Sequence, residues 1–405
     1  MKGRRAALSF IFVTLVIDLL GIGLIVPILP SLVDHLHQGD LSNSAVIYGS
    51  LAALYGAMQF LFSPVLGALS DRFGRRPVVL ISLLGGGLDY FLLAFAPSLA
   101  WFFVARMISG ISGANISAAT AYIADISPPE KRAANFGIVG AAFGLGFAVG
   151  PAIGGLLGSY DLRLPFIAAG CLTLLNFLYG YFILPESLAH ENRRAFQWKR
   201  ANPVSALLQL GSTRAMLAMA AVYFLYHLAH QVYQSTWVLY TVHRYSWSPL
   251  QIGLSLSFVG VMAAIVQGGL TRRIIPRLGE QRAVLAGLLV NALAFAAYAF
   301  AATGPMVYLI ITFGSLGAIA NPAIQGILSR SVGDSEQGRL HGSLNSLYSV
   351  TAVLGPTLHT TVFAYFIGRN APLVFPGASF MTSVILVLGA AGLSILAFRK
   401  HSFSS

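Results

Sequence analysis

Long apolar stretches alternate with short polar turns along almost the whole chain. A helix needs roughly 20 mostly apolar residues to cross the hydrocarbon core of a bilayer. The pattern therefore predicts an all-α integral membrane fold with twelve spanning helices in two bundles of six. We place the helices at 7–29, 45–69, 77–96, 98–124, 133–158, 164–184, 213–242, 249–274, 281–303, 304–329, 338–367 and 374–398.

Composition supports this interpretation and excludes a soluble enzyme. Of the 405 residues, 56% are hydrophobic and only 9% are charged, whereas a soluble domain carries about 25% charged residues. The first apolar stretch follows Lys2, Arg4 and Arg5 but contains Asp18 and no small-residue cleavage site, so it is a spanning helix and not a signal peptide.

The net charge of +12 is distributed as membrane topology requires. With a cytoplasmic N-terminus, Arg163, Arg244 and Arg369 lie outside and Arg106 lies within the membrane, which leaves 21 of the 25 Lys and Arg residues on the cytoplasmic side. We expect a monomeric multi-pass protein of the bacterial inner membrane with both termini in the cytoplasm. The expected partners are the lipid bilayer, protons and a small-molecule substrate, and not nucleic acid.

Three glycine-containing features recur at an offset of 205 residues. Gly74, Gly137 and Gly150-Pro151 correspond to Gly279, Gly342 and Gly355-Pro356. The recurrence predicts two parallel repeats. We assign an N-terminal bundle to 1–184, a cytoplasmic linker to 185–211 and a C-terminal bundle to 212–405. A short amphipathic helix is expected in the linker, around Phe196 and Trp198.

The loop at 67–77 combines Gly, Asp and Arg residues densely. Gly67 would let a neighbouring helix approach, and Asp71 would accept from free N–H groups at a helix end. Arg72 and Arg75 can pair with Asp125. Gly140–155 is rich in small residues for tight packing, and Gly150-Pro151 can bend that helix. The expected gating residues are Gly67, Asp71, Arg72, Gly74, Arg75, Arg76, Asp125, Gly150 and Pro151.

The 67–77 loop resembles the signature between helices 2 and 3 of the major facilitator superfamily. That resemblance implies a latch that holds the two halves in the outward-facing state; a plain basic loop is the alternative. The 140–155 stretch resembles the helix 5 motif of exporters in that superfamily. In the second half, Pro276 stands where the loop acid would be, so we expect an asymmetric latch.

Three charges fall within the apolar stretches: Asp18, Asp89 and Arg106. Charges are costly in lipid and should face the protein interior or a partner. Asp89 and Arg106 lie at equal depth on adjacent antiparallel helices, which predicts an ion pair. We expect Asp18 to be the carboxylate that exchanges protons and Asp89–Arg106 to be a switchable pair. A static network that only orients the helices is the alternative.

Further runs resemble the tetracycline efflux proteins, among them 20–30, 53–59, 105–110 and 121–125, and the similarity is patchier in the second half. The resemblance implies that Asp18, Asp89 and Arg106 support proton exchange and drug recognition. Two positions depart from the family, which has His in helix 8 and Asp in helix 9. This chain has Ala263 and Asn291 there.

His227 and His230 share one face of the seventh helix, and His359 lies in the eleventh. Imidazole can titrate near neutral pH, so His230 is a candidate for proton coupling, with a packing role as the alternative. Two His at this spacing could bind a metal, but no third ligand is evident, so we expect no metal and no cofactor. The expected substrate-binding residues are polar and at mid-depth: Gln59, Asn115, His227, Gln231, Gln234, Asn291 and Gln325.

These features together favour a secondary antiporter that exports a tetracycline-like drug or another small amphiphilic compound in exchange for protons. One alternative is a facilitator-type exporter or importer of a metabolite, such as a siderophore or a nutrient. A second is a sensor or scaffold with a transporter fold. An ATP-driven pump is disfavoured because no GxxxxGK[ST] stretch is present.

Overall fold

The computed structural model describes residues 2–37, 40–113, 115–127, 132–193, 196, 214–333 and 336–400, and within them it contains helices and no strand. Twelve helical spans in this part of the chain are long and apolar enough to cross a membrane, which confirms the predicted number and the all-α fold. In the first half the helices are α1 (Lys2–Ile25), α2 (Leu29–His37), α3 (Leu41–Phe73), α4 (Arg75–Ala94), α5 (Leu99–Gly113), α6 (Asn115–Ile126), α7 (Arg132–Tyr160) and α8 (Leu164–Ile183).

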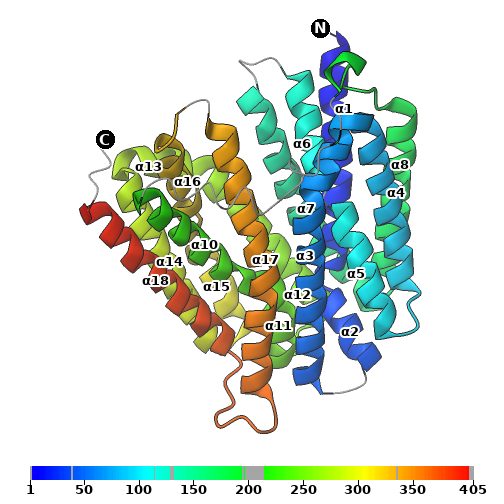
Figure 1. Ribbon diagram of the computed structural model, residues 1–405. Helices are drawn as coiled ribbons and strands as arrows, with labels where there is room; N and C mark the ends of the chain where they lie inside the picture. The colour runs from blue at the N-terminus through cyan, green and yellow to red at the C-terminus, as the bar shows by residue number, and fades with distance from the viewer. Residues whose placement is uncertain are drawn as a thin grey trace. The chain divides into compact units, whose positions relative to one another are not determined.

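The second half repeats this order with more interruptions (Figure 1). Its elements are α10 (Arg214–Ser235), α11 (Trp237–Tyr245), α12 (Pro249–Ile265), the π-helical turn η4 (Val266–Leu270), α13 (Thr271–Leu278), α14 (Glu280–Phe300), α15 (Gly304–Gly314), the 3-10 turn η5 (Ser315–Ile319), α16 (Ala320–Arg330), α17 (Gln337–Ile367) and α18 (Ala378–Lys400). Phe196 lies in the described part of the linker without regular structure, whereas Trp198 and the remainder of the expected linker helix lie outside the described residues.

The chain forms two compact units that do not coincide with the two halves of the sequence. Unit 1 comprises Met1–Gln38, Leu54–Asn202 and Trp247–Ser257, and unit 2 comprises Gly39–Ala53, Pro203–Ser246 and Phe258–Ser405. Each unit therefore contains one helix end from the opposite half: the start of α12 belongs to unit 1 and the start of α3 belongs to unit 2.

Packing inside the two units follows the sequence repeat. In unit 1, α1 packs on α7 and α8, and α4 packs on α8. In unit 2, α10 packs on α17 and α18, and α14 packs on α18. These are corresponding pairs, because α1, α4, α7 and α8 match α10, α14, α17 and α18 in the order of the repeat.

The exchanged helix ends rest on the two Gly-Pro pairs. In unit 1, Gly253 of α12 lies against Pro151 of α7, and the Ala152 N–H donates to the Ser257 hydroxyl at 3.0 Å. In unit 2, a Cβ on Gly49 of α3 would lie 3.2 Å from the carbonyl oxygen of Pro356 in α17. Glycine is needed at such approaches because any side chain would meet backbone.

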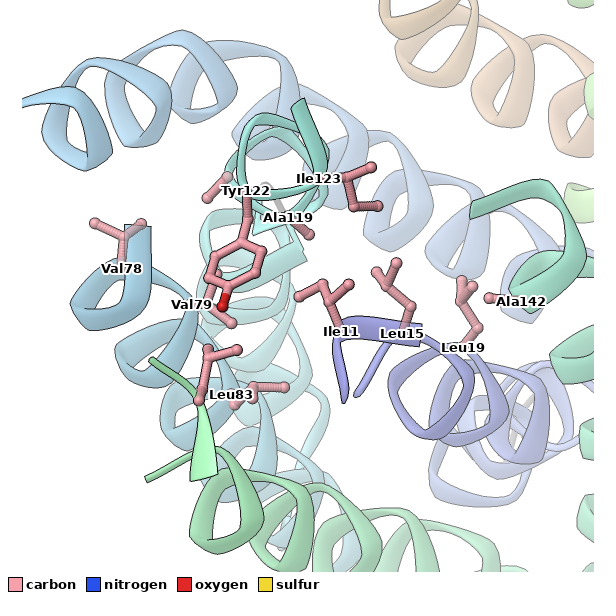
Figure 2. Close-up of a cluster of buried hydrophobic side chains, with 12 residues drawn as sticks. Ile11, Leu15, Leu19, Val78, Val79, Leu83, Ala119, Tyr122, Ile123 and Ala142 are labelled. Atoms are coloured by element: carbon pink, nitrogen blue, oxygen red, sulfur yellow. The ribbon is translucent and has the colours of Figure 1, made fainter. Parts of the chain in front are cut away.

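Apolar side chains fill the units and also cover their outer surfaces. One core cluster of unit 1 joins α1, α4, α6 and α7, and Figure 2 shows Ile11, Leu15, Val79 and Tyr122 facing one another within it. Large apolar side chains on the surface include Ile81, Phe182 and Leu293, which are 70%, 77% and 72% exposed. Such exposure suits contact with lipid, where apolar side chains need no cover.

At four places the helices are interrupted in a way that the apolar pattern does not predict. A turn at 26–28 leads into α2, so the first span continues beyond the predicted end at 29. Thr236 separates α10 from α11, next to Ser235, whose hydroxyl donates back to the Gln231 carbonyl at 2.8 Å. Such side-chain bonds compete with the helix ladder and bend it. The other two breaks are η4 and η5, and both contain glycine.

Candidate functional site

A buried charged cluster lies in unit 1 between α4 and α5. The Arg106 Nη2 atom is 3.6 Å from Asp89 Oδ2, which confirms the ion pair predicted from equal depth. Ser109 links the two, since Arg106 Nη2 donates to its hydroxyl at 2.9 Å and that hydroxyl donates to Asp89 Oδ2. Asp89 and Arg106 are 2% and 6% exposed. Ser109 was not among the predicted site residues, although its spacing of three from Arg106 places both on one helix face.

Two polar atoms of the cluster remain available for hydrogen bonding. Within the described residues, Asp89 Oδ1 and Arg106 Nε have no hydrogen-bond partner. A buried polar atom without a partner is costly. A proton, a water molecule or a polar substrate group at this point would therefore be bound favourably. An ion pair with a structural role alone would be more stable with both atoms hydrogen-bonded.

Tyr90 connects this cluster to Asp18 on α1, and Tyr55 lies beside the cluster. The Tyr90 hydroxyl interacts electrostatically with the Asp18 and Asp89 carboxylates and with the Arg106 guanidinium. The guanidinium carbon of Arg106 also lies 5.7 Å from the centre of the Tyr55 ring, within the range of a cation–π contact. The structure thus brings all three predicted membrane charges around one phenol.

Close glycine packing of α5 on α3 positions the edge of this cluster. A Cβ on Gly110 would lie 2.6 Å from the Tyr55 carbonyl oxygen, and a Cβ on Gly113 would lie 2.7 Å from the Tyr55 hydroxyl. Gln59, one helical turn along α3, donates to the Gly113 carbonyl at 3.2 Å. The Asn115 side chain lies outside what the structure describes.

Unit 2 has an imidazole–amide cluster at its centre instead of fixed charges. His230 Nδ1 lies 2.8 Å from the Tyr226 carbonyl oxygen, which can only accept, so Nδ1 carries a proton. The ring lies 4.1 Å from Tyr226 and 5.3 Å from Phe295, centre to centre. Asn291 of α14 bonds to the His230 side chain, and its amide donates to the Gly317 carbonyl at 3.0 Å.

His227 lies one helical turn away in an aromatic setting. Its ring centre is 4.3 Å from that of Tyr223 and 5.1 Å from that of Tyr348. Asn321 of α16 approaches the imidazole and accepts a hydrogen bond from Gln325 Nε2 at 3.0 Å. Among the described residues His227 Nε2 has no hydrogen-bond partner. The structure therefore groups His227, His230, Asn291 and Gln325 in one region of unit 2.

Two other predicted substrate-binding residues lie apart from that region. Gln231 is buried against Gly355, with its Nε2 atom 3.5 Å from the Thr351 hydroxyl. Gln234 has an exposed side chain, and its carbonyl accepts from the Tyr48 hydroxyl at 3.1 Å. His359 is buried and its Nε2 atom bonds to the Leu228 carbonyl at 3.0 Å, which is a packing role.

The signature loop holds a second, more exposed ionic cluster. Arg75 Nε lies 3.1 Å from Asp125 Oδ2, which confirms that predicted pair, and its Nη1 atom lies 2.6 Å from Asp71 Oδ1. Ser70 accepts from the same guanidinium at 2.7 Å. Arg72 instead lies over the Phe73 ring at 5.0 Å. The structure pairs Asp125 with Arg75 and not with Arg72.

One expectation for this loop is wrong, and a second stays a prediction. Asp71 does not accept from the free N–H groups at the start of α4; Glu186 does, from Arg75 N at 2.8 Å and Arg76 N at 3.3 Å. Glu186 was not among the predicted site residues, because its contact depends on how the chain folds back after α8. Gly67 has no heavy atom of the described residues within 4 Å of a would-be Cβ, so its role in close helix approach stays a prediction.

Glycines in α7 pack directly against α1, as predicted for the 140–155 stretch. A Cβ on Gly146 would lie 2.8 Å from Leu19 Cβ, and a Cβ on Gly150 would lie 2.8 Å from Gly23 Cα. Since α1 also carries Asp18, this contact fixes the backbone beside one of the three membrane charges. No group of three or more His, Cys, Asp or Glu suited to a metal ion occurs among the described residues.

Comparisons with known proteins agree with this geometry. The chain matches the model of the Major Facilitator Superfamily over residues 11–356. It is 43% identical over 365 residues to the class C tetracycline resistance protein of Escherichia coli, covering 90% of this chain and 91% of that protein. It is 38% identical over 362 residues to the class D protein of Salmonella ordonez, covering 89% and 90%.

A solved structure extends the similarity to the whole fold. The human organic anion transporter MFSD10 shares 27% identity with a TM-score of 0.71, covering 96% of this chain and 99% of that one. The match to the family model, the similarity to tetracycline resistance proteins over about 90% of the chain and the twelve membrane spans lead to one assignment. The chain belongs to the Major Facilitator Superfamily, as a membrane transporter closely related to the tetracycline efflux proteins.

Proposed function

We propose that the chain is a proton-coupled antiporter that exports a tetracycline-like drug or another small amphiphilic compound by alternating access. The observation that carries this proposal is the buried Asp89–Ser109–Arg106 cluster with Asp18 beside it at Tyr90. A transporter must bind and release protons at a group that reaches both sides in turn. Carboxylates that share a buried environment with one Arg meet that need.

The roles within the cluster follow from its contacts. Arg106 contacts Asp89 directly through the ion pair and indirectly through the Ser109 hydroxyl. We assign proton exchange to Asp18, whose carboxylate interacts with the Tyr90 hydroxyl. The same hydroxyl interacts with Asp89 and Arg106, so a change in the charge of Asp18 reaches both members of the ion pair.

Unit 2 supplies polar and aromatic groups for a ligand with both characters. His227 with its open Nε2 atom, Asn321 and Gln325 offer donors and acceptors beside the Tyr223 and Tyr348 rings. Apolar walls with a few placed polar groups are typical of small-molecule sites. We assign these residues to substrate binding, and His230 to a coupling role through its bond to Asn291.

Everted membrane vesicles with tetracycline as the probe test this function. The wild type should accumulate tetracycline under an imposed proton gradient, and addition of tetracycline should release protons from the vesicle lumen. Asp18→Asn should abolish both signals, whereas Asp161→Asn, an exposed loop acid, should leave both intact. An unchanged drug-induced proton flux in Asp18→Asn would contradict the proposal, and uptake only into right-side-out vesicles would favour a metabolite importer.

A further inference from the structure

The repeat offset relates two ion pairs whose charges are exchanged. In unit 1, Arg75 pairs with Asp125. Adding 205 to both numbers gives Glu280 and Arg330, and these two residues form an ion pair in unit 2. The Arg at the start of α4 thus corresponds to an acid at the start of α14, and the Asp at the end of α6 corresponds to an Arg at the end of α16.

The Glu280 carboxylate of this pair lies against Gly326 of α16. Glu280 is the first residue of α14 and Arg330 is the last residue of α16. A Cβ on Gly326 would lie 2.7 Å from Glu280 Oε1 and 3.1 Å from its Cδ atom, so the carboxylate occupies the space that this glycine leaves. The Glu280 side chain is 18% exposed and that of Arg330 is 69% exposed.

The two helix starts have the same backbone but different surroundings. Gly74 has φ 105° and ψ 160°, and Gly279 has φ 76° and ψ 153°. Over Gly74 lies the Glu186 carboxyl group, whose Cδ atom would be 2.7 Å from a Cβ there. Over Gly279 no described heavy atom lies within 4 Å of that position. The residue 205 positions after Glu186 is Ala391, which is buried inside α18.

Helix electrostatics explains why the signs differ. The free N–H groups at a helix start favour a negative charge there and disfavour a positive one. Arg75 is a cation at the first position of α4, and Glu186 offsets it by accepting from Arg75 N and Arg76 N. At the start of α14 the carboxylate belongs to Glu280 itself.

We propose that Glu280–Arg330 is the counterpart in unit 2 of the Arg75–Asp125 latch, and that its charges are exchanged because Glu280 also provides the negative charge that Glu186 provides in unit 1. Each unit then ties the start of one helix to the end of another with one ion pair and one carboxylate at the helix start. Unit 1 uses Asp125 and Glu186 for these two tasks, with Asp71 as a further partner of Arg75, and unit 2 uses Glu280 for both. Glu186, Glu280 and Arg330 are positioning residues of the transport cycle.

A double-mutant cycle tests whether Glu280 and Arg330 act as a pair. Glu280→Gln and Arg330→Gln should each lower the transport rate of tetracycline per molecule in everted vesicles by about tenfold, and the double variant should be no worse than Glu280→Gln alone. Arg282→Gln is the matched control, since Arg282 is exposed on the same helix and has no ion pair within the described residues. Additive losses would overturn the pairing.

A variant with the two charges swapped tests the role of Glu280 as the negative charge at the start of α14. Glu280→Arg combined with Arg330→Glu restores opposite charges but places a cation at the start of α14 without a carboxylate over Gly279. This variant should exceed Glu280→Arg alone and remain well below the wild type, both in transport and in melting temperature in detergent. Full recovery would overturn the role assigned to the helix start. The melting temperature keeps the test valid even where tetracycline proves not to be the substrate.

Discussion

The centres of the two units occupy corresponding helices and use different chemistry. Unit 1 holds two carboxylates and a guanidinium around Tyr90, and unit 2 holds two imidazoles among tyrosines and amides. In the sequence repeat, with its offset of 205 residues, Tyr223 of unit 2 corresponds to Asp18 of unit 1. Ionised side chains need a countercharge or hydrogen bonds in a membrane, whereas neutral imidazoles need only hydrogen bonds. Under the function proposed above, energy coupling lies mainly in unit 1 and ligand contact in unit 2.

The largest expected effect comes from breaking the charge balance of unit 1. Arg106→Gln leaves the Asp89 carboxylate buried without its cation, which costs about 3–5 kcal/mol. Tetracycline transport should be lost, and the melting temperature in detergent should fall. Arg163→Gln, in an exposed loop, is the control. A variant that transports normally would show that the pair is dispensable and would remove the contrast between the units.

A smaller effect is expected from His230 in unit 2. His230→Gln removes the ring that bonds to Tyr226 and Asn291, so gradient-driven transport should fall by about tenfold, as expected for coupled neighbours. Tetracycline counterflow without a proton gradient should persist, because it requires binding and alternation but no net proton movement. Equal loss of both activities would mean that His230 acts in structure or binding and not in coupling.

Glycine packing offers a third comparison of the units. Gly150→Ala would place a Cβ 2.8 Å from Gly23 Cα, a contact with backbone that should cost about 1–3 kcal/mol. Its repeat counterpart Gly355 would place a Cβ against Gln231 Cβ, which is fixed to the backbone and cannot rotate away, so Gly355→Ala should cost at least as much. Gly140→Ala, with no described heavy atom within 4 Å of the new Cβ, should be neutral. Thermal unfolding of the three variants tests this order, and a Gly140→Ala loss as large as the other two would refute it.

The smallest effect concerns pH and lies outside both centres. Burial, followed by the neighbouring Arg244, lowers the pKa of His243 below its usual 6.5. The unfolded chain therefore binds a proton more readily than the folded chain, and this residue destabilises the fold as the pH falls below about 6.5. His243→Asn should flatten the melting temperature between pH 6.5 and pH 5. An unchanged slope would place the acid sensitivity elsewhere, for example in the imidazole cluster.

Local patterns in the sequence predicted the features that depend on one helix or on simple depth. Apolar length gave the twelve spans, and equal depth below a shared turn gave the Asp89–Arg106 pair. The π-helical turn η4 and the break at Thr236 were not predicted, because apolar periodicity does not report hydrogen bonding within a helix. Glu186 escaped because residues 111 positions apart meet only in the folded chain.

The second ion pair was within reach of the sequence. Pro276 opposite Asp71 suggested a weakened loop, but the same offset applied to Arg75 and Asp125 leads directly to Glu280 and Arg330. The charges had changed places, so a search for identical residues could not detect them. In this chain, the two repeats share an ion pair at corresponding positions, although the residues that form it differ.

Glu186 follows the sixth spanning helix in the chain, yet its carboxylate completes the start of the third. Unit 1 therefore does not end with its last membrane helix. When the halves are co-expressed as separate polypeptides, a first fragment that ends before Glu186 lacks the acid over Gly74, whereas one that extends through Arg193 retains it. The division point, rather than the length of the connecting segment, then decides whether the first fragment assembles with a complete signature loop.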